Sequence, residues 1–119
     1  MKKFAYHGTD IDNLESIIKN GLEPRVPGDK ISFGTRPIIF YAIDPLLAAH
    51  YAGFTGILLR FDLPTDGRFV AKDALYYVTY KHIAPQNIEI FMAGIKPKRA
   101  TLNELLFTDN WTNIKNYVK

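Results

Sequence analysis

The chain has 119 residues, of which 47% are hydrophobic and 23% are charged, and these proportions are typical of a single globular domain. It contains no cysteine, which excludes disulfide and thiolate chemistry, and its three histidines lack the spacing of metal ligands. These two observations predict a protein without a structural metal. No apolar run approaches the length of a membrane span and the N-terminus lacks the apolar stretch of a signal peptide, so we also expect a cytoplasmic protein.

The net charge of +3 is placed unevenly along the chain. Basic and acidic residues balance over residues 1–93, and the whole excess lies in residues 94–119. A basic segment of this kind can contact nucleic acid or an acidic partner, although a solvated helix face is the simpler interpretation. No basic stripe interleaved with aromatic residues accompanies it, so sequence-specific nucleic-acid recognition is not supported.

The first predicted element is a strand over residues 3–6, which is followed directly by His7 and Gly8. Asp12, with a glutamate three positions later, predicts the start of a helix, and Gly21 predicts its end. The imidazole is thereby expected at a strand end, beside a glycine that lets a ligand approach bare backbone. Catalytic and binding residues are often found where a strand ends in a loop, so this histidine is the first candidate site residue.

The next segment is predicted to contain a long loop, a buried strand and a helix. Proline and glycine punctuate residues 23–36, and a loop of this length in a small domain is usually functional or disordered. The continuous apolar run over residues 37–43 predicts a buried strand. Asp44 as N-cap and Pro45 at the first helical position then predict a helix that runs through Tyr51.

Strands dominate the second half of the chain. They are predicted over residues 55–63, 76–80 and 87–92, which are rich in β-branched and aromatic residues. A capping box that begins at Thr101 predicts a short helix, and residues 110–117 suggest a final one. Because strands outnumber helices and are mostly joined without crossover helices, we expect an α+β fold with antiparallel strands.

Two motifs in this order resemble the ADP-ribosyltransferase superfamily. The first is Tyr-His-Gly-Thr over residues 6–9, with its following helix and Gly-Leu pair. The second is Ile-Phe-Tyr-Ala over residues 39–42, followed by a helix that ends in Ala-His-Tyr at residues 49–51. The superfamily includes poly(ADP-ribose) polymerase catalytic domains, small rifampin-modifying ADP-ribosyltransferases and RNA 2′-phosphotransferases. The resemblance covers residues 3–63 well and residues 64–93 loosely.

This resemblance implies a single domain with a particular architecture. Residues 1–93 would form the core, in which two antiparallel sheets make a split with flanking short helices, and residues 94–119 would form a basic C-terminal helical tail. NAD would lie in the cleft between the sheets. By analogy with the family, His7 would hydrogen-bond ribose hydroxyls and the backbone of Gly8 would grip the nicotinamide carboxamide. Thr9 completes this cofactor-binding motif.

The resemblance also implies aromatic residues around the nicotinamide, because a flat ring binds a flat heteroaromatic by dispersion and excludes water. Phe40 stands where the family has its stacking tyrosine, and Tyr41 follows it. Adjacent strand residues face opposite sides, so either the phenylalanine stacks or the tyrosine enters the cleft after a slip in register. Tyr51 matches the second stacking tyrosine, and a core residue at helical spacing is the alternative interpretation.

The family's acidic residue has no direct counterpart. A glutamate on a late strand would steady the positive charge of the transition state, but that place falls near Tyr76 and Tyr77. The rifampin-modifying members use an aspartate in an earlier segment, and Asp73 lies in the corresponding region. We favour it over Asp66 as the acidic residue. The alternative is a hairpin-loop aspartate beside Lys72.

Arginine suits the pyrophosphate of NAD because its guanidinium offers bidentate donors. Arg36 precedes the second motif as an arginine does in the RNA 2′-phosphotransferases, so it is a candidate for NAD binding. Arg25, at the start of the long loop, is interpreted as a surface residue.

The leading functional hypothesis is an NAD-binding ADP-ribosyltransferase-like enzyme, which transfers ADP-ribose to an acceptor and releases nicotinamide. His7, Tyr41 and Asp73 would be its catalytic residues, and the acceptor is a macromolecule or small molecule that the sequence does not identify. The first alternative is an inactive member of the same fold that binds a protein or nucleic acid. The second is an RNA 2′-phosphotransferase-like enzyme, which is weaker because the strand histidine of that group is absent.

Overall fold

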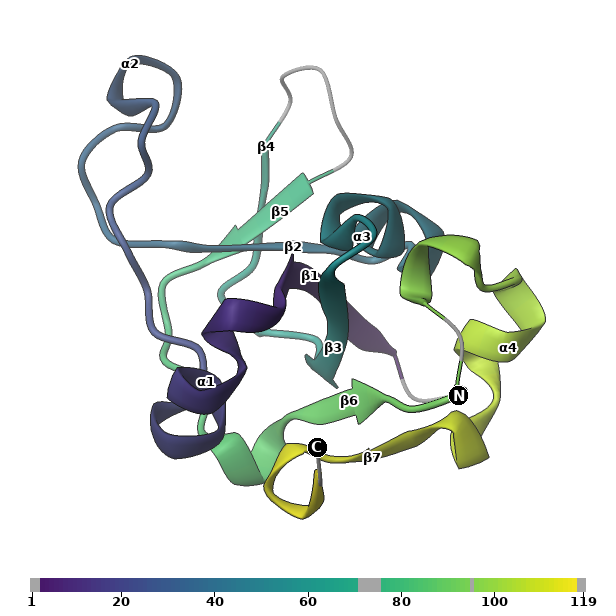
Figure 1. Cartoon of the computed structure of the whole chain (residues 1–119). Coiled ribbons are helices and arrows are strands. Elements are labelled where there is room, and N and C mark those ends of the chain that lie inside the picture. Colours follow the sequence, from purple (N-terminus) through teal and green to yellow (C-terminus); the bar gives the residue numbers. More distant parts are fainter. Residues whose placement is uncertain (1–2, 71–75, 95, 118–119) are drawn as a thin grey trace.

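The computed structural model describes residues 3–70, 76–94 and 96–117. It is an α+β domain with a seven-stranded antiparallel sheet in the order β4-β5-β2-β1-β3-β6-β7, with β4 and β7 at the two edges (Figure 1). The strands are β1 (Phe4–Asp10), β2 (Ile39–Ala42), β3 (Gly56–Asp62), β4 (Arg68–Val70), β5 (Tyr76–Thr79), β6 (Glu89–Phe91) and β7 (Trp111–Asn113). The α-helices are α1 (Leu14–Asn20), α2 (Lys30–Phe33), α3 (Pro45–Ala52) and α4 (Leu102–Leu106). The short 3₁₀ turns are η1 (Ile11–Asn13), η2 (Pro85–Asn87), η3 (Pro97–Arg99), η4 (Thr108–Asn110) and η5 (Ile114–Asn116).

The expected α+β class with antiparallel strands is confirmed, but the two separate sheets are not. Strand β1 pairs with β3 along all seven of its residues and also meets β2, which joins both halves into one sheet. The junction with β2 is narrow, since its register consists of Tyr6 opposite Ala42. Beyond this pair the two strands splay apart. The two-sheet split implied by the family resemblance is therefore wrong for the described residues, whose strands form one continuous sheet.

Both faces of the central strand β3 are buried, which explains its continuous apolar run in the sequence. On β3, Leu59 and Phe61 enter one core cluster with α1 residues such as Ile17, whereas Leu58 enters the other cluster with Ala48 of α3. Alternation along the strand thus fills both sides with apolar side chains.

Helix α3 begins as the sequence predicts and approaches β1 very closely. The carboxylate of Asp44 accepts a hydrogen bond from the backbone of Leu46, and Pro45 occupies the first turn. A Cβ atom placed on Gly8 would lie 2.2 Å from the carbonyl oxygen of Ala48 and 2.8 Å from the backbone nitrogen of Ala52. The glycine is therefore required for this helix to rest on the strand.

Two predictions at the N-terminal end were wrong. Strand β1 continues through Asp10, so His7 lies inside a strand rather than at its end, because pairing with β3 extends the ladder through the Gly-Thr pair. The carboxylate of Asp10, rather than that of Asp12, caps the following turn, whose end leads into α1. The predicted end of that helix at Gly21, with φ of 78°, is confirmed.

The predicted helix over residues 110–117 was also wrong, because this segment supplies β7 and the turn η5. The ring of Trp111 is buried, and its Nε1 donates a hydrogen bond to the carbonyl of Leu105. The guanidinium of Arg60 lies 4.5 Å from this ring and 4.1 Å from that of Phe4, and its Nε donates to Glu89 at 2.8 Å. Burial of the tryptophan against this arginine favours an added strand over a solvated helix. Strand β4 was not predicted.

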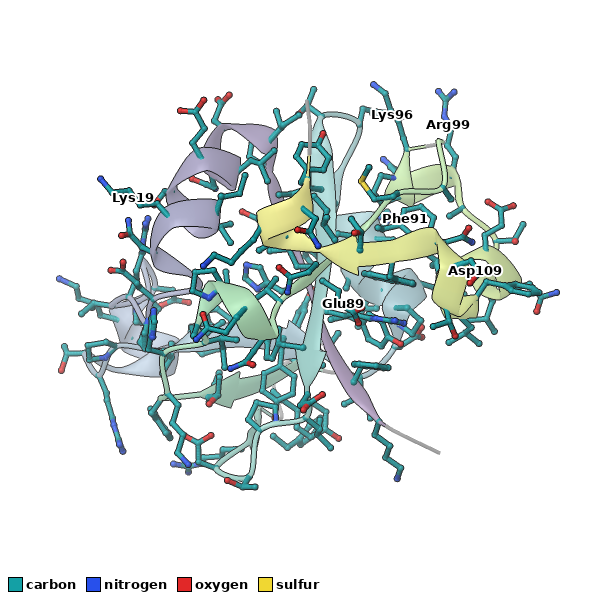
Figure 2. The ribbon with its side chains drawn as sticks, turned by 90° about the horizontal axis from the view of Figure 1, so that it is seen from below. Lys19, Glu89, Phe91, Lys96, Arg99 and Asp109 are labelled. Carbon is teal, nitrogen blue, oxygen red and sulfur yellow. The ribbon has the colours of Figure 1, made fainter. Side chains whose placement is uncertain are left out.

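Three of the basic residues near the C-terminal end, Lys96, Lys98 and Arg99, lie at the turn η3. Lys96 and Arg99 are exposed and point outward together (Figure 2). The ammonium of Lys98 lies 4.2 Å from the ring of Phe54, and the guanidinium of Arg99 lies 5.4 Å from it. Across the described residues, none of the helices combines the length and apolar character that a membrane span requires.

Candidate functional site

Two pockets meet where β1 and β2 splay apart. The first, called the aromatic pocket here, has a volume of about 370 Å³ and is lined by Tyr6, His7, Gly8, Phe33, Phe40, Tyr41, Ala42, Ala48, Tyr51 and Tyr76. The second, called the polar pocket, has a volume of about 240 Å³ and is lined by residues of β1, α1, the following loop and β2. His7 and Phe40 line both pockets. These two residues therefore stand between two adjoining hollows.

The imidazole of His7 spans the opening between the two strands. Its Nδ1 donates a hydrogen bond to the carbonyl oxygen of Phe40 at 2.6 Å, since a carbonyl can only accept. Burial lowers the pKa of this histidine, and the hydrogen bond to Phe40 opposes that effect only in part. The ring is therefore neutral near pH 7, which leaves Nε2 with a lone pair that can accept a hydrogen bond from a ligand.

The lowered pKa of His7 predicts a stability change at mildly acidic pH. The unfolded chain takes up a proton on this side chain below about pH 6.5, whereas the folded chain does so only at lower pH. The free energy of unfolding should therefore fall as the pH decreases from 6.5 toward the folded pKa. Urea unfolding between pH 8 and pH 5 should show a smaller decrease for His7→Gln than for the wild type. Equal decreases would contradict the assignment.

The two neighbouring aromatic residues of β2 face opposite sides. Tyr41 borders the aromatic pocket, but its ring is buried in the core, where it stacks on Tyr77 at 5.6 Å and contacts Phe61. Phe40 is only partly buried and lies 5.1 Å from the ring of Phe33. Of the two alternatives left open by the sequence, the geometry therefore places the phenylalanine ring among the rings of the aromatic pocket and keeps the tyrosine ring in the core.

Three further rings complete the aromatic pocket. Tyr51 is 56% exposed, which argues against the alternative of a core residue. Its ring lies 4.8 Å from that of Tyr76, which in turn lies 6.4 Å from Phe40. Phe33, from α2 in the long loop, and Tyr76 were not predicted as site residues. The signal for Tyr76 was its place on β5, where the family resemblance led us to look for an acid.

The described lining of the aromatic pocket contains no carboxylate. Asp73, the favoured acidic residue, lies outside the described residues. Asp66 accepts hydrogen bonds from the hydroxyl of Thr79 and from the backbone nitrogen of Tyr80. Burial opposes its ionisation, but these bonds and nearby Lys81 hold the pKa of Asp66 below its usual value. Asp66 therefore fixes the loop before β4 and does not face the pocket.

The hydroxyl of Tyr76 is buried and has no hydrogen-bond partner in the described part of the chain. A buried unsatisfied hydroxyl costs about 1–3 kcal/mol. We therefore expect Tyr76→Phe to leave the free energy of unfolding unchanged or raise it by up to about 1 kcal/mol. The matched control is Tyr6→Phe, which removes a hydrogen bond to buried Arg60 and should be destabilising. A loss of stability in Tyr76→Phe, measured by urea unfolding, would show that the hydroxyl has a partner.

The remaining candidate residues are divided between the two pockets and the surface. Gly8 borders the aromatic pocket, and Thr9, whose hydroxyl accepts a hydrogen bond from Asn13, borders the polar one. Arg36 borders neither, because its guanidinium lies 3.6 Å from the centre of the Tyr80 ring. Arg25, which was interpreted as a surface residue, lines the polar pocket instead.

No family model, curated protein or solved structure matches this chain. The resemblance to the ADP-ribosyltransferase superfamily therefore depends on the motif residues and their arrangement alone. Within the described ranges, no group of three or more His, Asp or Glu side chains is arranged to hold a metal ion. The site thus consists of one neutral imidazole, a set of aromatic rings and a neighbouring polar hollow.

Proposed function

We propose that the protein is an ADP-ribosyltransferase-like enzyme that binds NAD across the two pockets. The nicotinamide ring lies in the aromatic pocket and the rest of the dinucleotide extends over the polar pocket. The observation that carries this proposal is the position of His7, which lines both pockets and has a neutral ring whose Nε2 can accept a hydrogen bond. Such an acceptor suits the ribose hydroxyls that connect the two ends of the ligand.

The chemical character of each pocket supports this orientation. The aromatic pocket is walled by Phe40 and Tyr51, and ring faces suit a flat heteroaromatic group. The polar pocket is bordered by Thr9, Asn13 and Arg25, which offer hydroxyl, amide and guanidinium groups. The arginine supplies the bidentate donors that a pyrophosphate prefers.

The reaction that follows is transfer of ADP-ribose. The bond between nicotinamide N1 and ribose C1′ breaks, and nicotinamide leaves with the electron pair as a neutral molecule. A nucleophilic atom of the acceptor forms a bond to C1′ and loses its proton to solvent. A carboxylate near C1′ stabilises the positive charge that develops on the ribose, and Asp73 remains the proposed residue for that role. The acceptor is an unidentified macromolecule or small molecule.

A second candidate is a catalytically inactive protein of the same fold, which binds NAD or a macromolecule without turnover. The presence of Tyr76, rather than an acid, on the pocket side of β5 favours this alternative. An RNA 2′-phosphotransferase is the weakest candidate, because β2 carries no histidine.

Thermal unfolding with NAD and an assay of free nicotinamide test the proposal together. A ligand that is selective for the folded state raises the melting temperature by mass action. We expect NAD to stabilise the wild type, to stabilise Phe40→Leu much less, and to stabilise the control Phe107→Leu fully, because Phe107 is exposed and borders neither pocket.

Release of nicotinamide in the same samples distinguishes the two candidates. Turnover by the wild type and its loss in Phe40→Leu support the enzyme. Stabilisation without turnover supports the inactive alternative. No stabilisation by millimolar NAD would contradict the enzyme and the inactive NAD-binding protein, and would leave only an inactive protein that binds a macromolecule.

A further inference from the structure

The turn η3 and the residue Phe54 after α3 form what we call the basic surface, made of Phe54, Lys96, Lys98 and Arg99. All four side chains are exposed. The ammonium of Lys98 lies 4.2 Å from the centre of the Phe54 ring, and the guanidinium of Arg99 lies 5.4 Å from it. An exposed aromatic ring is therefore bordered by cations from a distant segment of the chain.

The three cations of the basic surface are not paired with carboxylates. In the described part of the chain, none of them forms an ion pair. Glu104, on the helix that follows η3, accepts a hydrogen bond from the hydroxyl of Thr101 instead. Lys96 and Arg99 point outward together on one side of the molecule (Figure 2). This group of unpaired positive charges attracts an anionic partner.

A hollow of about 450 Å³ adjoins the basic surface. Phe54 and Lys96 line it together with mainly apolar residues, and its volume is sufficient for a flat ring. Asp10 and Asp12 flank Ile11, which also lines the hollow. Because these carboxylates repel an anion, we expect an anionic group at the border formed by η3 and not at this one.

We propose that the basic surface binds single-stranded nucleic acid, with a base stacked on Phe54 and phosphates held by the three cations. This inference goes beyond the proposed function and does not depend on it. Every nucleotide of a single strand combines a flat ring with a phosphate, so an exposed ring bordered by cations matches it in both respects. Stacking on an aromatic side chain is possible for every base, so the binding tolerates different sequences.

The contacts between the cations and the ring favour this ligand over an acidic protein. Carboxylates of a protein would pair with the cations and leave the ring of Phe54 unused. The contacts also hold the long side chains of Lys98 and Arg99 beside the ring before a ligand binds, which reduces the entropy lost on binding. The basic surface is therefore prepared for a base and a phosphate that lie next to each other.

Fluorescence anisotropy with a labelled oligothymidylate of about twelve nucleotides tests the proposal. At low salt, the wild type should bind it with a dissociation constant of about 1–100 μM. Each phosphate contact on a single strand changes the slope of log K against log salt concentration by about −0.7, so three contacts predict a slope of about −2. An oligoadenylate of the same length should bind with similar affinity.

Variants of the cations assign the phosphate contacts to the basic surface. Lys98→Gln and Arg99→Gln should each weaken binding about fivefold to tenfold at low salt and make the slope less steep by about 0.7. Lys19→Gln is the matched control, because exposed Lys19 lies on α1, well away from η3 in Figure 2, and its loss changes the net charge equally. Equal effects of Lys19→Gln and Lys98→Gln would overturn the proposal, since the attraction would then depend on net charge alone.

Phe54→Leu removes the ring and keeps the charge. It should weaken binding of the single strand about fivefold or more and leave the salt slope unchanged. Phe107→Leu replaces another exposed phenylalanine that does not line this hollow, and it should bind as the wild type does. Near-ultraviolet circular dichroism verifies that each variant is folded.

Competition distinguishes nucleic acid from an acidic protein. Polyglutamate of matched charge should displace the labelled strand much less effectively than unlabelled oligothymidylate does. Equal displacement by the two, together with unchanged affinity in Phe54→Leu, would indicate an acidic protein as the partner and overturn the proposal. No change in anisotropy up to about 1 mM protein at low salt would overturn it as well. None of these outcomes bears on NAD binding, which is measured separately.

Discussion

Gly8→Ala is expected to lower the free energy of unfolding by about 1–3 kcal/mol and to disturb the aromatic pocket. The added methyl group would lie 2.2 Å from the carbonyl oxygen of Ala48 and 2.8 Å from the backbone nitrogen of Ala52. Backbone atoms cannot avoid it by changing a rotamer, so α3 must move away from β1. Because Tyr51 lies on this helix, the movement also displaces one wall of the pocket. The midpoint of urea unfolding measures the loss.

The chain offers a matched control for this substitution. A Cβ atom on Gly28 would meet no atom within 4 Å, so Gly28→Ala should leave the urea midpoint unchanged or raise it slightly. If the two variants were equally stable, the close approach of α3 to β1 would not be a constraint on the fold.

His7→Ala is expected to weaken NAD binding by about tenfold or more. The variant loses the acceptor nitrogen that we propose contacts the ligand, and it loses the hydrogen bond that joins the ring to the carbonyl of Phe40. It also removes a side chain that lines both pockets. Isothermal titration with NAD, at a temperature well below the melting point of the variant, separates the loss of affinity from a loss of stability.

His82→Ala is the control for this measurement, because His82 is exposed and lines neither pocket. It should bind NAD as the wild type does. An affinity of His7→Ala within twofold of the wild type would mean that the imidazole does not contact the ligand.

Much of the fold followed from local sequence signals. The Asp-Pro start of α3, the glycine end of α1 and the apolar run of β3 each depend on neighbouring residues, and each was predicted correctly. The errors arose where contacts between segments that are distant in the sequence determine the secondary structure. Residues 110–117 have the polar character of a surface helix, yet Trp111 gains more by burial against Arg60 and Phe91 at the sheet edge.

The candidate site was predictable only in part for the same reason. Strand alternation requires Phe40 and Tyr41 to face opposite sides, but both sides of this sheet are apolar, so the sequence alone does not assign either residue to the pocket. Tyr76 and Phe33 reach the pocket only through the pairing of β5 with β2 and the return of the long loop. No periodic pattern in the sequence indicates that these distant residues line the same pocket.

Nuclear Overhauser effects between NAD and labelled aromatic side chains test the central claim most directly. With NAD at saturation, the protons of the nicotinamide ring should show cross-peaks to the rings of Phe40 and Tyr51, and the ribose protons should show them to His7. Cross-peaks from nicotinamide to residues outside the aromatic pocket, or none at saturation, would contradict the account.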